Sequence, residues 1–391
     1  MGISKRAEAV RESETIAIDA KAKRLLKEGF EVINFSIGEP DIGTPNNVKA
    51  KTIEAVRKDI TKYSPAAGRL DLREAIAKKL KDDNSLDYPP EGIIVSSGAK
   101  QSLYSAIMAT INPGDEVMIP RPYWVSYPEQ VKLCGGVPVF ADTGEGFMPS
   151  AESIRQKITR RTRMLILNSP NNPTGMVYGE KLLKEIAKIA VENGILVISD
   201  EIYEKFIYGS KHRSIASLGS DIKELTITIN GVSKSHSMTG YRIGYAAASS
   251  EIVKAMARIQ SHTSGPSSIS QYAAVEALSG NKDSVERTRK IFERRRDMIA
   301  KGLSSIPGIR LAKPLGAFYA FPDITEAFAR RFGRLQGQSM SRTFAEKLLD
   351  DQKVATIAGE AFGDDRCIRL SYALPEDKID EGMARISRFV G

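Results

Sequence analysis

The sequence has few cysteines and no long apolar run. Its 391 residues include two cysteines, Cys134 and Cys367, too few for a disulfide framework and typical of a reducing compartment. No apolar run approaches the roughly 20 residues that span a bilayer, and the start MGISKRAEAVRESE lacks the apolar core of a secretory signal. We therefore expect a cytoplasmic protein without a membrane segment.

Several common catalytic signatures are also missing. The three histidines, His212, His236 and His262, lie far apart and lack the spacing of metal ligands, so no metal is expected. The sequence contains no GxxxxGK[ST], GxGxxG, HExxH or GxSxG motif. This disfavours a P-loop, a dinucleotide site, a zinc protease and a serine hydrolase.

The charge balance is mildly basic. There are 57 Lys and Arg against 48 Asp and Glu, a formal net charge of +9. The densest basic run, 290–301, is interrupted by acidic residues and is typical of a solvated helix face rather than a nucleic-acid site. We expect no nucleic-acid partner, and a positive field that attracts small anions.

Strand and helix patterns alternate through the middle of the chain. Short apolar runs, separated by helical patterns, occupy 92–97, 115–120, 135–142, 163–170, 194–201 and 224–231. This order predicts an α/β fold with a mainly parallel sheet flanked by helices. Ligands bind such sheets beyond the carboxyl ends of the strands, and the polar clusters SSGAK, PYW, NSPNNPTG, SDEIY and NGVSK follow these runs.

The pattern changes near residue 285. A long charged helix is expected over 284–305, then a strand–turn–strand in IRLAKPLGAFYAFP, a helix near 339–352, a strand in CIRLSYA and a final helix. We expect an N-terminal segment (1–45) that packs on the small domain and the active site. A large cofactor-binding domain (46–284) and a small α+β domain (285–391) would follow.

One lysine lies in an unusual setting. Lys234, in NGVSKSHSMTGYRIGY (230–245), is surrounded by small residues, with Arg242 eight positions later. A lysine attacks carbonyls only when deprotonated, and lowering its pKa from about 10.4 to near 7 costs the charged form roughly 4–5 kcal/mol. Burial, a nearby arginine or condensation with an aldehyde cofactor would meet that need.

Four motifs together resemble class I aminotransferases of the pyridoxal-phosphate fold-type I superfamily. SPNNPTG (169–175), SDEIY (199–203), SKSHSMTGYRIGY (233–245) and IRLSYA (368–373) occur in the order and spacing of that family. The likeness runs through nearly the whole chain. Within the family, the sequence is most similar to bacterial and archaeal aspartate aminotransferases, the branch that includes aspartate/prephenate enzymes. The resemblance implies a seven-stranded sheet in the large domain.

The resemblance implies which residues would contact the aldehyde carbon and the ring of the cofactor. Lys234 would form a Schiff base with pyridoxal 5′-phosphate and later carry a proton, and Asp200 would pair with the ring nitrogen. Tyr203 and Asn172 would donate to the phenolic oxygen, and Trp124 would stack on the ring. Simpler roles, such as a strand-end cap for Asp200 or a turn at Asn172, remain as alternatives.

The resemblance also implies a phosphate site. The backbone of Gly98, Ala99 and Lys100, at a strand-to-helix turn, suits an anion. Arg242 would add a charged contact to the phosphate. Ser233 is also expected to contact the cofactor.

Two further positions concern the phosphate. Tyr63 matches a tyrosine that reaches the phosphate of the neighbouring subunit, so a homodimer with active sites at the subunit interface is expected. Gly231 departs from the family, because many relatives have serine three positions before the lysine. A phosphate contact would therefore be missing or supplied by another group.

Substrate recognition needs two carboxylate sites. By resemblance, Arg369 would hold the α-carboxylate in a two-pronged contact, near the backbone of Gly38; a salt bridge between strands is the alternative role for Arg369. Lys100, with Ser13 and Thr15, would hold the distal carboxylate; Lys100 serving only the phosphate is the alternative. Trp124 and Asn172 would also contact the substrate.

These assignments predict an aspartate aminotransferase. It would move the amino group of L-aspartate to 2-oxoglutarate in a ping-pong cycle. The alternatives are an aromatic amino acid, alanine or prephenate aminotransferase, and then a carbon–sulfur lyase or decarboxylase on the same fold. A cofactor-binding regulator that acts on nucleic acid is disfavoured, because no helix-turn-helix segment is appended.

Overall fold

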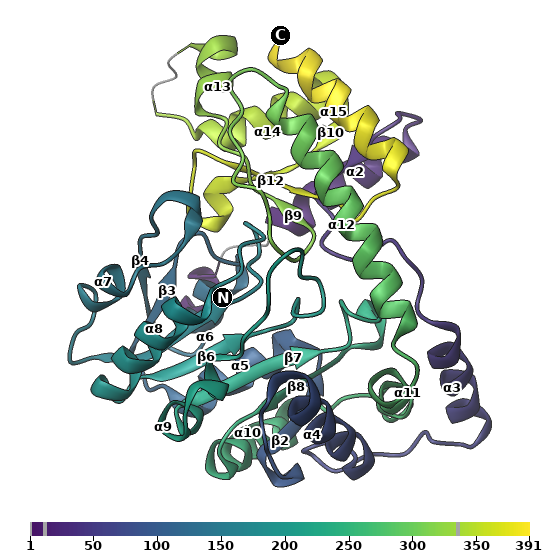
Figure 1. The fold of residues 1–391 in the computed structure, drawn as a ribbon, viewed down its shortest axis with the longest axis vertical. Coiled ribbons are helices and arrows are strands. Elements are labelled where there is room, and N and C mark those ends of the chain that lie inside the picture. Colours follow the sequence, from purple (N-terminus) through teal and green to yellow (C-terminus); the bar gives the residue numbers. More distant parts are fainter. Residues whose placement is uncertain (1, 11–13, 334–336) are drawn as a thin grey trace.

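The computed structural model describes residues 2–10, 14–333 and 337–391 (Figure 1). A seven-stranded mixed sheet forms the centre of its larger part, in the order β2-β8-β7-β6-β5-β3-β4. Its strands are β2 (Ile93–Ser97), β3 (Glu116–Pro120), β4 (Val137–Ala141), β5 (Thr162–Asn168), β6 (Leu196–Asp200), β7 (Thr226–Gly231) and β8 (Ile243–Ala247). All pairings are parallel except those of β8, which runs antiparallel to both β2 and β7. The predicted fold class, α/β with a mainly parallel seven-stranded sheet, is confirmed.

Helices cover both faces of this sheet. They are α3 (Asn46–Arg57), α4 (Leu70–Asn84), α5 (Ala99–Thr110), α6 (Ser126–Leu133), α7 (Ala151–Arg155), α8 (Glu180–Asn193), α9 (Ser220–Glu224), α10 (Ser250–Thr263) and α11 (Ser268–Ser279). Along β5, Met164 and Ile166 join one apolar cluster, and Leu165 and Leu167 join another. Alternate side chains of a strand point to opposite faces, so the strand is buried on both sides.

A smaller unit stands beside the sheet, reached by the long helix α12 (Asp283–Ser304) (Figure 1). It contains the helices α13 (Thr325–Phe332), α14 (Met340–Gln352) and α15 (Glu376–Val390). Its antiparallel sheet consists of β11 (Ile357–Ala358), β12 (Ile368–Ser371) and β9 (Tyr319–Ala320). Phe292, Phe318, Phe344 and Phe389 are fully buried in its core.

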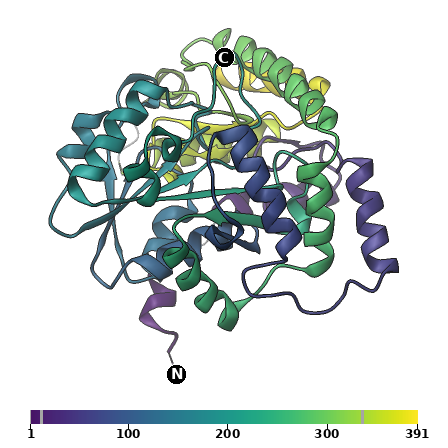
Figure 2. The ribbon, with the colours of Figure 1, turned by 60° about the horizontal axis from the view of Figure 1, so that its bottom comes forward.

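The N-terminal segment packs on the smaller unit. It holds α1 (Lys5–Glu8), α2 (Glu14–Lys27) and β1 (Ile33–Asn34), and β1 pairs with β10 (Val354–Ala355). Ala22 and Val32 form an apolar cluster with Leu349 and Ala355. The segment contains two helices, and its far end lies at the periphery of the molecule (Figure 2). The division into domains stays a prediction.

Two local predictions were wrong. The strand β8, which begins at Ile243, was not among the predicted strands; its residues are buried throughout, so polar and apolar residues do not alternate. The expected first strand of IRLAKPLGAFYAFP is reduced to an isolated bridge between Arg310 and Asp323, ahead of the strand-breaking Pro314. Within the described ranges, no helix is both long and apolar enough to span a membrane.

Candidate active site

A cavity of about 350 Å³ lies where the parallel strands β5, β6 and β7 end. The predicted site residues that line it are Gly38, Ala99, Lys100, Trp124, Asn172, Asp200, Tyr203, Ser233, Lys234, Arg242 and Arg369. They come from the N-terminal loop, the sheet and β12 of the smaller unit. Parallel strands place their carboxyl ends at one edge of a sheet, which explains why distant motifs meet there.

Lys234 is half-buried in this cavity, on the loop after β7. Its Nζ donates a hydrogen bond of 2.7 Å to the carbonyl oxygen of Gly38. Burial lowers the pKa of Lys234 to about 8; Glu39 opposes this shift and Arg242 adds to it. About a tenth of such an amine is deprotonated at pH 7, which makes it a usable nucleophile and proton carrier.

Asp200, at the end of β6, is a buried carboxylate. Tyr127 donates its hydroxyl hydrogen to Asp200 Oδ2 at 2.7 Å, and the backbone N–H of Ile202 donates to Oδ1 at 3.2 Å. Burial raises the pKa of Asp200 to about 6, although both hydrogen bonds lower it. Among the described residues, no cation forms an ion pair with this carboxylate, so it can accept a positively charged ring nitrogen. Sequence reasoning missed Tyr127, although it lies only three positions after Trp124.

Two asparagines fix the loop after β5. Asn168 Nδ2 donates to the backbone oxygen of Asp200 at 3.0 Å, and Asn168 Oδ1 accepts from the backbone N–H of Asn172 at 2.8 Å. Asn168 therefore connects the loop of Asn172 to the end of β6. Its role was not predicted, although it is the first polar residue after a buried run.

The start of α5 forms an anion site. Gly98 precedes the helix with φ of 85°, a region that favours glycine, and an added Cβ would collide with the Arg242 guanidinium. Gly98 therefore leaves room for the Arg242 side chain, but it does not itself line the cavity. Arg242 donates to the backbone oxygens of Thr239 and Ser97, at 2.9 and 3.2 Å. A helix start beside an arginine without a carboxylate partner among the described residues suits a phosphate.

Arg369, on β12, is only 2% exposed. It donates to the backbone oxygen of Ser36 at 2.7 Å and to Asn172 Oδ1 at 3.2 Å, and its Nε has no hydrogen-bond partner. No carboxylate within the described ranges lies at ion-pair distance, so the alternative of a salt bridge between strands does not apply. Burying an uncompensated charge is costly, and an anionic ligand would remove this cost.

Lys100 lies near the start of α5. Its Nζ is 4.9 Å from the centre of the Trp124 ring, and burial together with the Arg242 charge lowers its pKa. The part of the chain that the structure describes offers Lys100 no ion pair. Ser13 lies outside the described residues, and Thr15 belongs to α2 without a described side chain, so the proposed pair stays a prediction.

Tyr63 and Gly231 differ in solvent exposure. The Tyr63 side chain is fully exposed and does not line the cavity of its own chain. Gly231 is buried between β7 and β8, where an added Cβ would lie 2.8 Å from the Ile243 carbonyl oxygen. This close approach leaves no room for a serine side chain at position 231.

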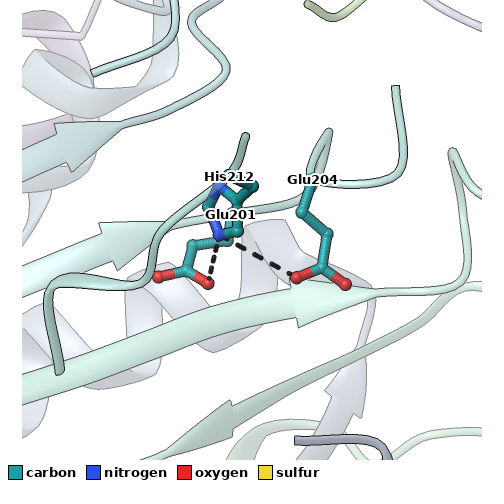
Figure 3. A group of neighbouring side chains, drawn as sticks. All are labelled: Glu201, Glu204 and His212. Atoms are coloured by element: carbon teal, nitrogen blue, oxygen red, sulfur yellow. Dashed lines mark hydrogen bonds and ion pairs between the residues drawn. The ribbon is translucent and has the colours of Figure 1, made fainter. Parts of the chain in front are cut away.

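An ion-pair network follows the end of β6 in the chain (Figure 3). His212 Nε2 is 2.9 Å from Glu201 Oε2 and 4.0 Å from Glu204 Oε2. Lys79 pairs with Glu204, and Asn84 Nδ2 donates to both carboxylates at 3.2 and 2.6 Å. Burial would raise the pKa of Glu204, but the charges of Lys79, Lys205 and His212, together with the hydrogen bond from Lys79, outweigh burial and lower the pKa to about 2. These oxygens already accept hydrogen bonds, so we interpret the group as structural.

Comparisons with known proteins agree with this geometry. The family model "Aminotransferase class I and II" matches residues 31–386. The chain is 49% identical to an aspartate aminotransferase of Bacillus sp. (strain YM-2), over 99% of both chains. It is 47% identical to a probable aspartate/prephenate aminotransferase of Aquifex aeolicus, over 99% of this chain and 98% of that one.

Solved structures of aspartate aminotransferases are also similar to this chain, over nearly its whole length. An aspartate aminotransferase from Thermus thermophilus with maleate has a TM-score of 0.93 and 40% identity, over 99% of both chains. The enzyme from Rhizobium meliloti has a TM-score of 0.95 and 38% identity, over 100% of this chain and 99% of that one. The chain therefore belongs to the class I and II aminotransferase family.

Proposed function

We propose that this protein is an aspartate aminotransferase that uses pyridoxal 5′-phosphate to move the amino group of L-aspartate to 2-oxoglutarate. The observation that carries the proposal is the buried Arg369 guanidinium, which faces the cavity of Lys234 without a carboxylate partner among the described residues. Lys100 lines the same cavity and supplies a second cation. Two cations suit a dicarboxylate, and one structural relative is described with maleate, which is a dicarboxylate.

The cavity residues fit the cofactor. Lys234 has the lowered pKa that bonding to an aldehyde needs. No cation of the described residues forms an ion pair with the buried Asp200 carboxylate, and the start of α5 with Arg242 suits a phosphate. When bound, pyridoxal 5′-phosphate supplies the electron sink that makes the substrate Cα proton removable.

The chain's own residues bind the substrate and move the proton. Arg369 holds the α-carboxylate by two parallel N–H donors, and Lys100 holds the distal carboxylate. Lys234, freed as an amine, would take the proton from the substrate Cα and deliver it to the C4′ carbon of the cofactor. Asp200 would keep the ring nitrogen protonated, and Tyr203 and Asn172 would donate hydrogen bonds to the phenolic oxygen.

We also propose a homodimer whose active sites are completed across the subunit interface. Tyr63 is fully exposed in the single chain, and a group of exposed apolar side chains on one face indicates an interaction surface. The neighbouring helices α3 and α4 expose Ile53, Val56 and Leu70, and α3 lies at the outer edge in both views (Figures 1 and 2). A second copy that covers this face would place its Tyr63 against the phosphate site.

The domain division and the location are proposals as well. An N-terminal segment (1–45) that packs on a small domain (285–391), beside a large domain (46–284), allows Arg369 to move with the small domain. Such a movement would close the cavity on the substrate. Cys134 and Cys367 are both buried and free, which supports a reducing, cytoplasmic location.

Prephenate is the second candidate substrate. The relatives from Aquifex aeolicus and Thermus thermophilus are named as aspartate/prephenate aminotransferases, the first of them as probable. Lys100 is a single flexible cation, less demanding in geometry than an arginine. It suits distal carboxylates at more than one distance.

One titration tests the proposed function. The purified protein with bound cofactor should lose its yellow absorption on adding aspartate and regain it with 2-oxoglutarate, while oxaloacetate and glutamate accumulate. Prephenate should restore the colour if the second candidate also holds. Release of ammonia with pyruvate, or of carbon dioxide, in place of amino transfer would show a lyase or decarboxylase instead.

A further inference from the structure

Tyr319 is a cavity residue without a role in the scheme above. It lies on β9, which pairs with β12 so that Tyr319 faces Ser371, two positions from Arg369. Its side chain is 1% exposed and lines the cavity. It belongs to the stretch GAFYAF, for which the sequence predicted only a strand.

Tyr319 touches three parts of the site. Its hydroxyl is 2.9 Å from the hydroxyl of Tyr203, and its ring centre is 4.7 Å from the Arg369 guanidinium carbon. An added Cβ on Gly38 would lie 3.0 Å from the Tyr319 hydroxyl, so the N-terminal loop also packs against it. One side chain therefore connects the large unit, the small unit and the N-terminal segment.

The role of the Tyr203–Tyr319 contact depends on which of the two hydroxyls donates the hydrogen bond. Each hydroxyl has one hydrogen to donate and can accept others. Burial raises the pKa of both Tyr203 and Tyr319, so both stay protonated. Within the described residues, their mutual bond is the one hydrogen bond that either hydroxyl makes. One proton serves this bond, and the other stays available for a ligand.

We propose that Tyr319 is a positioning residue that acts through Tyr203 and Arg369. Its hydroxyl donates to Tyr203, which leaves the Tyr203 hydrogen for the phenolic oxygen of the cofactor and strengthens that donor. Its ring supports the guanidinium of Arg369 in the orientation that receives the α-carboxylate. The inference rests on the proposed function, because it concerns the same site.

Two substitutions separate the two roles. Tyr319→Phe removes the hydroxyl and keeps the ring, whereas Tyr319→Leu removes both. We expect the pH midpoint of the bound cofactor's absorption to rise by about half a unit or more in both variants, because a weakened donor at the phenolic oxygen favours the protonated form. The KM for aspartate should change less than about threefold in Tyr319→Phe and rise at least tenfold in Tyr319→Leu.

A matched control removes another buried hydroxyl. Tyr372 donates to the backbone oxygen of Ala317 at 3.3 Å and does not line the cavity. Tyr372→Phe should leave the pH midpoint unchanged. An unshifted midpoint in Tyr319→Phe, or an equal shift in Tyr372→Phe, overturns the hydroxyl role. An unchanged KM in Tyr319→Leu overturns the ring role.

These outcomes differ from a failure of the proposed function. If the unaltered protein with cofactor shows no amino transfer from aspartate, the function is wrong whatever the variants do. If the unaltered protein transfers amino groups and Tyr319→Phe has the same pH midpoint of cofactor absorption, only the proposed role of the Tyr319 hydroxyl is refuted.

Discussion

Replacing Lys100 with methionine tests the distal carboxylate site. Methionine keeps an apolar side chain over the Trp124 ring and removes only the charge. A hydrogen bond to a charged group contributes about 1.5–3 kcal/mol, and Lys100 is partly exposed, so the lower half of this range applies. With about 1.4 kcal/mol per tenfold, kcat/KM for aspartate should fall about 10- to 40-fold.

Phenylalanine serves as the internal reference for this variant. It lacks a distal carboxylate, so its kcat/KM should change less than about threefold in Lys100→Met. The measurement is a coupled assay of both amino donors at saturating cofactor. Equal losses for aspartate and phenylalanine would refute the reasoning, and would place Lys100 at the cofactor phosphate alone.

Three further predictions follow from the site and its surroundings. Arg369→Ala should lower kcat/KM at least about 100-fold for every amino donor, because a charged contact to the common α-carboxylate is lost; a loss confined to aspartate would contradict this. Tyr63→Phe should weaken cofactor binding about tenfold in equilibrium dialysis, and light scattering should show a dimer; a monomer with unchanged affinity would disprove the shared site. The pKa of Glu204 is lowered in the folded protein, so its contribution to stability is full above about pH 4.5 and is lost as the pH falls towards 2. In urea titrations, Glu204→Gln should therefore lose less unfolding free energy than the unaltered protein between pH 4.5 and 2, and parallel curves would oppose this account.

The sequence predicted the parts of the fold that depend on local patterns. The buried runs of β5, β6 and β7 were recognised because each is short, apolar and followed by polar residues. Parallel strands then bring Asn172, Asp200 and Lys234 to one edge, as the structure places them. Their catalytic roles stay predictions.

Contacts between distant segments were not predictable in the same way. Tyr127 meets Asp200 across 73 positions, and Tyr203 meets Tyr319 across 116 positions. Nothing in a local pattern distinguishes such tyrosines from ordinary core residues, because their partners are fixed only when the sheet and the smaller unit pack together. That no carboxylate of the described residues pairs with Arg369 is likewise visible only once the sheet and the smaller unit are packed together.

The covalent attachment of the cofactor at Lys234 is the most direct test of the whole account. The unaltered protein and Lys234→Ala are each loaded with pyridoxal 5′-phosphate, reduced with borohydride, digested and analysed by mass spectrometry, and amino transfer is measured before reduction. We predict that the cofactor is fixed to the peptide containing Lys234, and that Lys234→Ala fixes none and loses at least about 10³-fold in activity. Fixation at another lysine, or a variant that still fixes the cofactor and transfers amino groups at the original rate, would contradict the account.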